Sequence, residues 1–219
     1  MPRTPGQLVT ILGADYFQPI ADLIDRLTKR SARRPDRVQA GSRESGYSAS
    51  CILLLVAMFE SYVSRLRYVH AGKIPNKKRN AVEVILVAFP KLRNQRALQD
   101  VYVLRDILIH AHLWEIDYEW GGPVPMVLKS ATLHPASGDE KFRKRVNFKT
   151  YRTKALGLSV FPTRVNRTDL LKVFETTWKI LEVMEHANRS QCYVSQQNVH
   201  YRGKLVLFSS LQSELSSAL

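Results

Sequence analysis

The chain of 219 residues has few of the features that mark secreted, metal-binding or nucleotide-binding proteins. It contains two cysteines, Cys51 and Cys192, whose spacing fits neither a disulfide framework nor a zinc motif. It has no glycine-rich phosphate loop, no internal repeat and no low-complexity tract. We therefore expect no metal and no cofactor, and we expect Cys51 to pack as a small apolar side chain.

Long hydrophobic runs are also missing. The longest, from Cys51 to Phe59, is much shorter than the roughly 20 residues that cross a bilayer, and Glu60 follows it. The N-terminus lacks the continuous apolar stretch of a signal peptide. These features predict a soluble, cytoplasmic protein that makes no membrane contact.

Acidic residues are scarce relative to basic ones. The chain has 33 Lys and Arg residues against 19 Asp and Glu residues, which gives a net charge of +14 and a pI near 10.0. A hydrophobic content of 45% is enough for one buried core. The charge indicates polyanionic partners, and nucleic acid is the most common of these.

Apolar residues recur at helical spacing in several segments, and we predict an all-α bundle of four to five helices. The expected helices cover residues 14–31, 47–68, 81–89, 94–116 and 166–186. Asn166, with Asp169 three residues later, has the pattern of a helix N-cap.

We expect one domain over residues 1–219, in which other segments flank the helical core. The core covers residues 45–118 and 166–188 and follows an N-terminal helix and basic loop at 1–44. Residues 119–165 lose the helical period and predict a small irregular or β-hairpin insertion. Residues 189–219 form a C-terminal extension, with a short strand around 204–208 and a frayed terminal helix.

The expected 94–116 helix has an apolar stripe that includes Ala111. Beside this stripe it carries an unusual set of polar residues. Asp106 and His110 are four residues apart, so the carboxylate could hold and orient the imidazole. Arg105 offers a forked donor suited to phosphate. Because Arg105 and His110 lie about 140° apart around the helix, a second helix must face them, and a two-fold dimer would supply one.

This pattern resembles the signature of the HEPN (higher eukaryotes and prokaryotes nucleotide-binding) superfamily, in which Arg and His are separated by four to six residues. Here it reads Arg105-Asp106-Ile107-Leu108-Ile109-His110. The preceding helix carries Phe59-Glu60-Ser61-Tyr62-Val63, which is similar to an aromatic-plus-glutamate pattern of that family. The resemblance covers residues 45–118 and 166–188.

The resemblance implies a helical bundle that dimerises through the signature helices and, in active members, a metal-independent ribonuclease that leaves a 2′,3′-cyclic phosphate. His110 would then move a proton, Arg105 would stabilise the phosphorane and Asp106 would orient the histidine. It further implies RNA as substrate, a role in prokaryotic defence or toxin–antitoxin systems, and an antitoxin or regulatory partner. Some members carry a modifiable tyrosine two residues after the signature histidine, but this chain has His112 there. His112 and Glu60 are possible auxiliary residues.

Residues 141–154 combine seven basic residues with aromatic rings, a composition typical of single-stranded nucleic-acid binding. The candidate nucleic-acid contacts are Lys141, Arg143, Lys144, Arg145, Lys149, Arg152, Phe148 and Tyr151.

Structural alternatives stand beside each functional interpretation. The polar residues of the 94–116 helix could be a solvated face with an ordinary ion pair, and the basic insertion could be a solubilising hairpin whose rings turn inward. The segment from Arg65 to His70 has the same Arg–His spacing but lacks a polar residue after the arginine. The main alternative function is a non-catalytic nucleic-acid-binding or scaffolding module.

Overall fold

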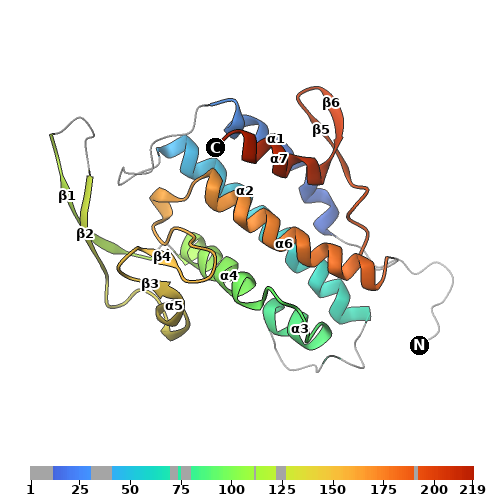
Figure 1. Cartoon of the computed structure of the whole chain (residues 1–219), viewed down its shortest axis with the longest axis horizontal. Helices are drawn as coiled ribbons and strands as arrows, with labels where there is room; N and C mark the ends of the chain where they lie inside the picture. Colours follow the sequence, from blue (N-terminus) through green and yellow to red (C-terminus); the bar gives the residue numbers. More distant parts are fainter. Residues whose placement is uncertain are drawn as a thin grey trace.

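The fold is built around one long central helix, α2 (Ser42–Val69), against which α1 (Phe17–Thr28), α3 (Ala81–Ala88), α4 (Gln95–His110) and α6 (Arg167–Ala187) all pack (Figure 1). The computed structural model describes residues 12–30, 41–69, 74, 80–110, 112–121, 127–189 and 192–219. The basic loop after residue 30, His70 and Ala111 lie outside these ranges. Apolar residues at helical spacing in α2, such as Leu55, Phe59 and Tyr62, are fully or almost fully buried.

The N-terminus of α6 is fixed by the cap that the sequence predicts. The Asn166 side chain accepts hydrogen bonds from the backbone N–H groups of Thr168 and Asp169, and the Asp169 carboxylate accepts one from the Asn166 backbone. The next residue, Arg167, is buried and pairs with Glu44 of α2 at 2.6 Å. The Arg167 guanidinium also donates to the carbonyls of Arg30 and Ala218. This arginine therefore joins four separate segments of the chain.

The N-terminal helix is confirmed and is preceded by a 3₁₀ turn, η1 (Leu12–Tyr16). In that turn Gly13 lies so close to α2 that an added Cβ would come within 2.9 Å of the Met58 carbonyl. The Gly13 N–H donates to the Ser61 hydroxyl at 2.9 Å. Residue 13 therefore has to be small.

The structure corrects the predicted end of the fourth helix. α4 stops at His110, and residues expected to continue it to 116 instead form strand β1 (Trp114–Glu119), which pairs antiparallel with β2 (Val127–Leu133). Residues 114–119 alternate apolar and acidic side chains, a period of two that fits a strand with a partner. The expected β-hairpin is present, but it begins earlier than predicted.

The rest of the insertion contains a short helix that was not expected. α5 (Glu140–Arg145) begins at Asp139, whose side chain caps it by accepting from the Phe142 N–H at 2.7 Å. The pair β3 (Val146–Asn147) and β4 (Arg152–Thr153) and the turn η2 (Pro162–Arg164) follow it. These elements close over a second, smaller apolar cluster formed by Ile107, Leu133, Phe142, Val146 and Val160.

The C-terminal segment belongs to the main core. It forms the hairpin β5 (Asn198–Tyr201) and β6 (Lys204–Leu207), the turn η3 (Phe208–Ser210) and α7 (Leu211–Ser217). The predicted strand at 204–208 is confirmed, but the terminal helix is not frayed, because Leu211 and Leu215 are fully buried. The Phe208 ring lies 4.7 Å from that of Phe17. The class is therefore mostly helical, with three small antiparallel sheets in the described part of the chain.

One helix, over Ser42–Tyr68, is long and apolar enough to cross a membrane by length and composition. Half of its most apolar window is buried inside the protein. This burial is compatible with the core helix of a soluble protein.

Candidate functional site

The predicted signature residues lie on the partly exposed side of α4, next to α2. The Arg105 and Asp106 side chains are 32% and 48% exposed. Ile109 is 49% exposed, and His110 is exposed as the last residue of the helix. The apolar stripe of the same helix, including Leu104 and Ile107, is fully buried. The stripe holds α4 in place and leaves its polar edge open to solvent.

Arg105 is held between two carboxylates from two helices. One guanidinium nitrogen lies 2.8 Å from Asp106, and another lies 3.9 Å from Glu60 of α2. The hydrogen bond to Asp106 and the charge of Glu60 raise the pKa of Arg105 above its already high value. The structure thus brings Glu60 together with Arg105, although 45 residues separate them. The remaining N–H donors of the guanidinium are available to a phosphate oxygen.

Tyr102 lies beside Glu60 and Arg105 and was not predicted as a site residue. Burial, together with the adjacent Glu60 carboxylate, raises the pKa of Tyr102, so its hydroxyl stays protonated. The one signal in the sequence was its position, one helical turn before Arg105 and Asp106.

Asp106 and His110 do not form the expected pair in this structure. The Asp106 carboxylate accepts its hydrogen bond from Arg105, and among the described residues it has none from His110. His110 lies at the end of α4 with its imidazole exposed. It is therefore accessible to a substrate hydroxyl and to solvent, but no neighbouring carboxylate orients it.

His112 occupies a different environment from His110. Its ring packs edge-on against Phe142 with 4.7 Å between centroids, and its Nδ1 atom is buried without a hydrogen-bond partner among the described residues. Burial lowers the pKa of His112, and the nearby His110 lowers it further, against the opposing effects of Asp106 and Asp139. His112 is consequently neutral near pH 7, and its main contact is with the insertion.

The basic insertion is docked against α4, directly beside this site. Ile107 of α4 is fully buried in the second apolar cluster together with Phe142 and Val146 of the insertion. On the same helix, the Asp100 carboxylate accepts from the backbone N–H groups of Ala155 and Leu156 at 2.7 and 2.9 Å. Asp100 was not predicted, and no local pattern identifies an acceptor for amides 55 residues away. These contacts join the insertion to the helix that carries Arg105 and His110.

The cations of the insertion fall into two groups. Arg143 donates to the Ser137 carbonyl, Lys144 pairs with Glu140 at 2.6 Å, and Arg152 donates to the Gly157 carbonyl at 2.7 Å. The side-chain nitrogens of Lys141, Arg145 and Lys149 form no ion pair or hydrogen bond with any described residue, and only the backbone N–H of Lys149 donates, to the Asn147 side chain. The second group is the better candidate for contacts to phosphate.

The aromatic residues of the insertion mostly turn inward. Phe142 is only 4% exposed, and the Tyr151 hydroxyl accepts from the Ala131 N–H at 3.0 Å. Phe148 is 38% exposed, and its ring lies 6.1 Å from that of Trp114. Among the predicted rings, Phe148 thus offers the most open face for a base.

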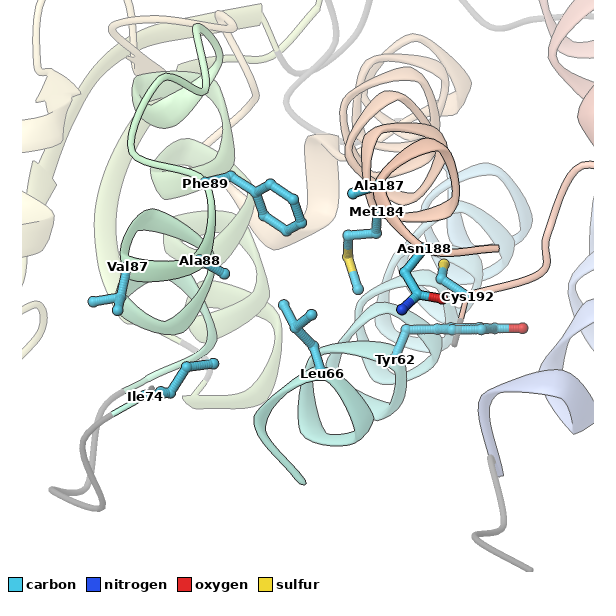
Figure 2. Close-up of a pocket in the computed structure, with 10 residues that line it drawn as sticks. All are labelled: Tyr62, Leu66, Ile74, Val87, Ala88, Phe89, Met184, Ala187, Asn188 and Cys192. Carbon is cyan, nitrogen blue, oxygen red and sulfur yellow. The ribbon is translucent and has the colours of Figure 1, made fainter. Parts of the chain in front are cut away.

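An apolar cavity of about 310 Å³ opens elsewhere, between α2, α3 and α6. Figure 2 shows Leu66, Phe89 and Met184 pointing toward one another across it. Burial and the neighbouring Glu185 raise the pKa of Cys192 at its wall to about 12, so the thiol is protonated and is a poor nucleophile. The cavity contains none of the predicted site residues and no obvious catalytic group.

No family model, curated protein or solved structure matches this chain. Among the described residues, no group of three or more His, Cys, Asp or Glu side chains is arranged to hold a metal ion. The candidate site therefore consists of residues from α4, α2 and the insertion.

Proposed function

We propose that the protein is a metal-independent endoribonuclease of HEPN type that acts as a homodimer. The single observation that carries the proposal is the docking of a basic insertion against the same helix that presents Arg105 and the exposed His110. The positive charge that attracts RNA and the candidate catalytic groups would then lie on one surface. A cytoplasmic location, a defence or toxin–antitoxin role and a restraining antitoxin or regulatory partner belong to the same proposal.

The chemistry follows from the two exposed groups. The imidazole of His110, when neutral, can remove the proton from the 2′-hydroxyl of RNA as the oxygen attacks the adjacent phosphorus. The bond from phosphorus to the 5′-oxygen then breaks, this oxygen takes up a proton from solvent, and the imidazolium returns its proton to solvent. The products are a 2′,3′-cyclic phosphate and a 5′-hydroxyl. The Arg105 guanidinium stabilises the negative charge on the phosphorane oxygens.

The first test is cleavage of a mixed RNA pool in EDTA. Arg105→Ala and His110→Ala should each lower the cleavage rate by about 100-fold or more, because each removes a transition-state contact, while RNA affinity stays nearly constant. Matched controls are Arg96→Ala, an exposed residue of the same helix, and His186→Ala, an exposed histidine on α6. An RNA with a 2′-deoxy nucleotide at the cleaved position should resist cleavage because it lacks the attacking hydroxyl.

A second candidate function is a non-catalytic nucleic-acid-binding or scaffolding module. The observation in its favour is that Asp106 accepts from Arg105, which leaves His110 without an orienting carboxylate. If it is correct, RNA stays intact at every protein concentration. Replacing Lys141, Arg145 and Lys149 should then lower affinity and the slope of affinity against salt, whereas His110→Ala should change neither.

A further inference from the structure

The hairpin β1–β2 presents an apolar face that is only partly covered. Along β1, alternate residues Trp114, Ile116 and Tyr118 lie on one face, and Trp120 follows just beyond the strand. At the base, Trp114 packs on Phe161 with 4.6 Å between ring centroids. Further out the exposed fractions rise, to 37% for Ile116, 49% for Tyr118 and 71% for Trp120. The apolar stripe thus begins inside the protein and continues out into solvent.

The hairpin extends away from the helices (Figure 1), and residues 115–119 along its first strand are exposed among the described residues. All residues of β1 after Trp114 are exposed. An isolated two-stranded ribbon is marginally stable in water, and exposed apolar stripes of this kind mark interaction surfaces. The outer half of the hairpin is therefore suited to a protein partner.

A hollow of about 250 Å³ lies at the base of the same face. Its walls include Leu113, Ile116, Leu128, Phe161 and Pro162. This volume corresponds to about eight water molecules at roughly 30 Å³ each, which is enough for one large aromatic side chain. The chain's own Trp120 does not fill the hollow, because it is 71% exposed and is not part of the hollow's lining.

The opposite face of β1 is acidic in a strongly basic protein. Glu115, Asp117 and Glu119 alternate with the apolar residues, and Lys129 of β2 pairs with Glu119 alone, while the chain as a whole carries a charge of +14. This face repels the phosphates of a nucleic acid and attracts a basic protein surface. A second copy of this chain is such a surface.

We infer that two copies of the chain exchange their β1–β2 hairpins, with Trp120 of each copy inserted into the hollow at the base of the other copy's hairpin. The chain carries both halves of the contact, an exposed indole and an open apolar hollow, so a two-fold axis satisfies both at once and closes the assembly. Because β1 follows α4 after three residues, this contact lies beside the candidate site. The inference gives a geometry to the homodimer on which the proposed function rests.

The test is the mass in solution, measured by light scattering across a range of protein concentrations. The wild type should be a dimer of twice 25.1 kDa, and Trp120→Ser should weaken the dimer by about 30-fold, as expected when an aromatic anchor leaves its pocket. The matched control is Leu205→Ser, because Leu205 is 65% exposed on the other large hairpin and should leave the mass unchanged. A monomeric wild type, or a dimer that Trp120→Ser does not weaken, would overturn the inference.

A photo-crosslinking amino acid, p-benzoylphenylalanine, at position 120 identifies the contact itself. Irradiation should give a product of dimer mass with the cross-link in residues 113–116 or 161–164 of the other copy. A cross-link to any other surface, or only monomer, argues against the exchange. Arg105→Ala should leave the mass unchanged in every case. A dimer that cross-links as expected but does not cleave RNA contradicts the nuclease proposal alone, whereas RNA cleavage by a dimer that Trp120→Ser does not weaken contradicts the hairpin exchange alone.

Discussion

The two large hairpins of this protein differ in how they are held. In β5–β6, Val199 and Tyr201 are 2% and 5% exposed. The Gln18 side chain of α1 accepts a hydrogen bond from the His200 N–H and donates one to the His200 carbonyl. In β1–β2, every residue of β1 beyond Trp114 is exposed. The first hairpin uses alternate side chains of β5 to cover the core, whereas the second leaves Ile116, Tyr118 and the following Trp120 exposed.

This difference separates structural from functional surface. A hairpin whose apolar face is buried contributes to folding, and its sequence is explained by that role. The exposed Trp120 at the end of the β1 face buries little apolar surface within its own chain and adds little to the stability of the monomer. Interaction surfaces are therefore best sought in β1–β2 and in the α4 residues that precede it.

The largest expected effect on stability comes from a residue next to the β5–β6 hairpin. Phe208, directly after β6, is fully buried, and its ring lies within 5.4 Å of the rings of Phe17, Phe174 and Trp178. Phe208→Ala should lower the free energy of unfolding by about 3–5 kcal/mol, because it removes buried apolar surface and leaves a cavity. Urea denaturation followed by circular dichroism measures this change.

The control comes from the other hairpin. Trp120→Ala, measured at a concentration where the chain is monomeric, should change the free energy of unfolding by less than about 0.5 kcal/mol. Equal losses in the two variants would contradict the contrast between the hairpins.

A smaller, pH-dependent effect is expected at the junction between α4 and the β1–β2 hairpin. The folded state lowers the pKa of His112, chiefly by burial, so below the ordinary value of about 6.5 the unfolded chain binds a proton that the folded chain does not. Stability should therefore be highest above about pH 6.5 and fall as the pH drops through the lowered pKa. His112→Phe keeps a ring against Phe142 but cannot titrate, and should flatten this fall. Denaturation midpoints between pH 8 and 5 test it, and parallel curves for the two proteins would argue against the effect.

Local patterns predicted the parts of the fold that local physics controls. The Asn166–Asp169 cap and the apolar periodicity of α2 are properties of neighbouring residues, and both are present as expected. The end of α4 was placed too late because residues 94–116 keep apolar positions that a helix could use. The strand from Trp114 depends on pairing with β2, whose first residue is 13 positions away.

The candidate site depended more on tertiary structure. The family resemblance pointed to Glu60, but no local pattern gives its 3.9 Å distance from Arg105 or directs Asp100 to the amides of Ala155 and Leu156. The basic run predicted a surface, but it could not show that Phe142 turns into a second core. The roles of Arg105, Asp106 and His110 in catalysis stay predictions that biochemical measurement must test.

The most direct measurement mixes two inactive variants. In a composite site built from Arg105 of one copy and His110 of the other, a heterodimer of Arg105→Ala and His110→Ala retains one intact site. After equal mixing, half of the dimers are heterodimers, and each heterodimer has one of its two sites intact. The mixture should therefore show about a quarter of wild-type RNA cleavage. Cleavage restored to this level in EDTA is the result we predict. Wild-type cleavage with no recovery in the mixture would contradict a site shared between two copies.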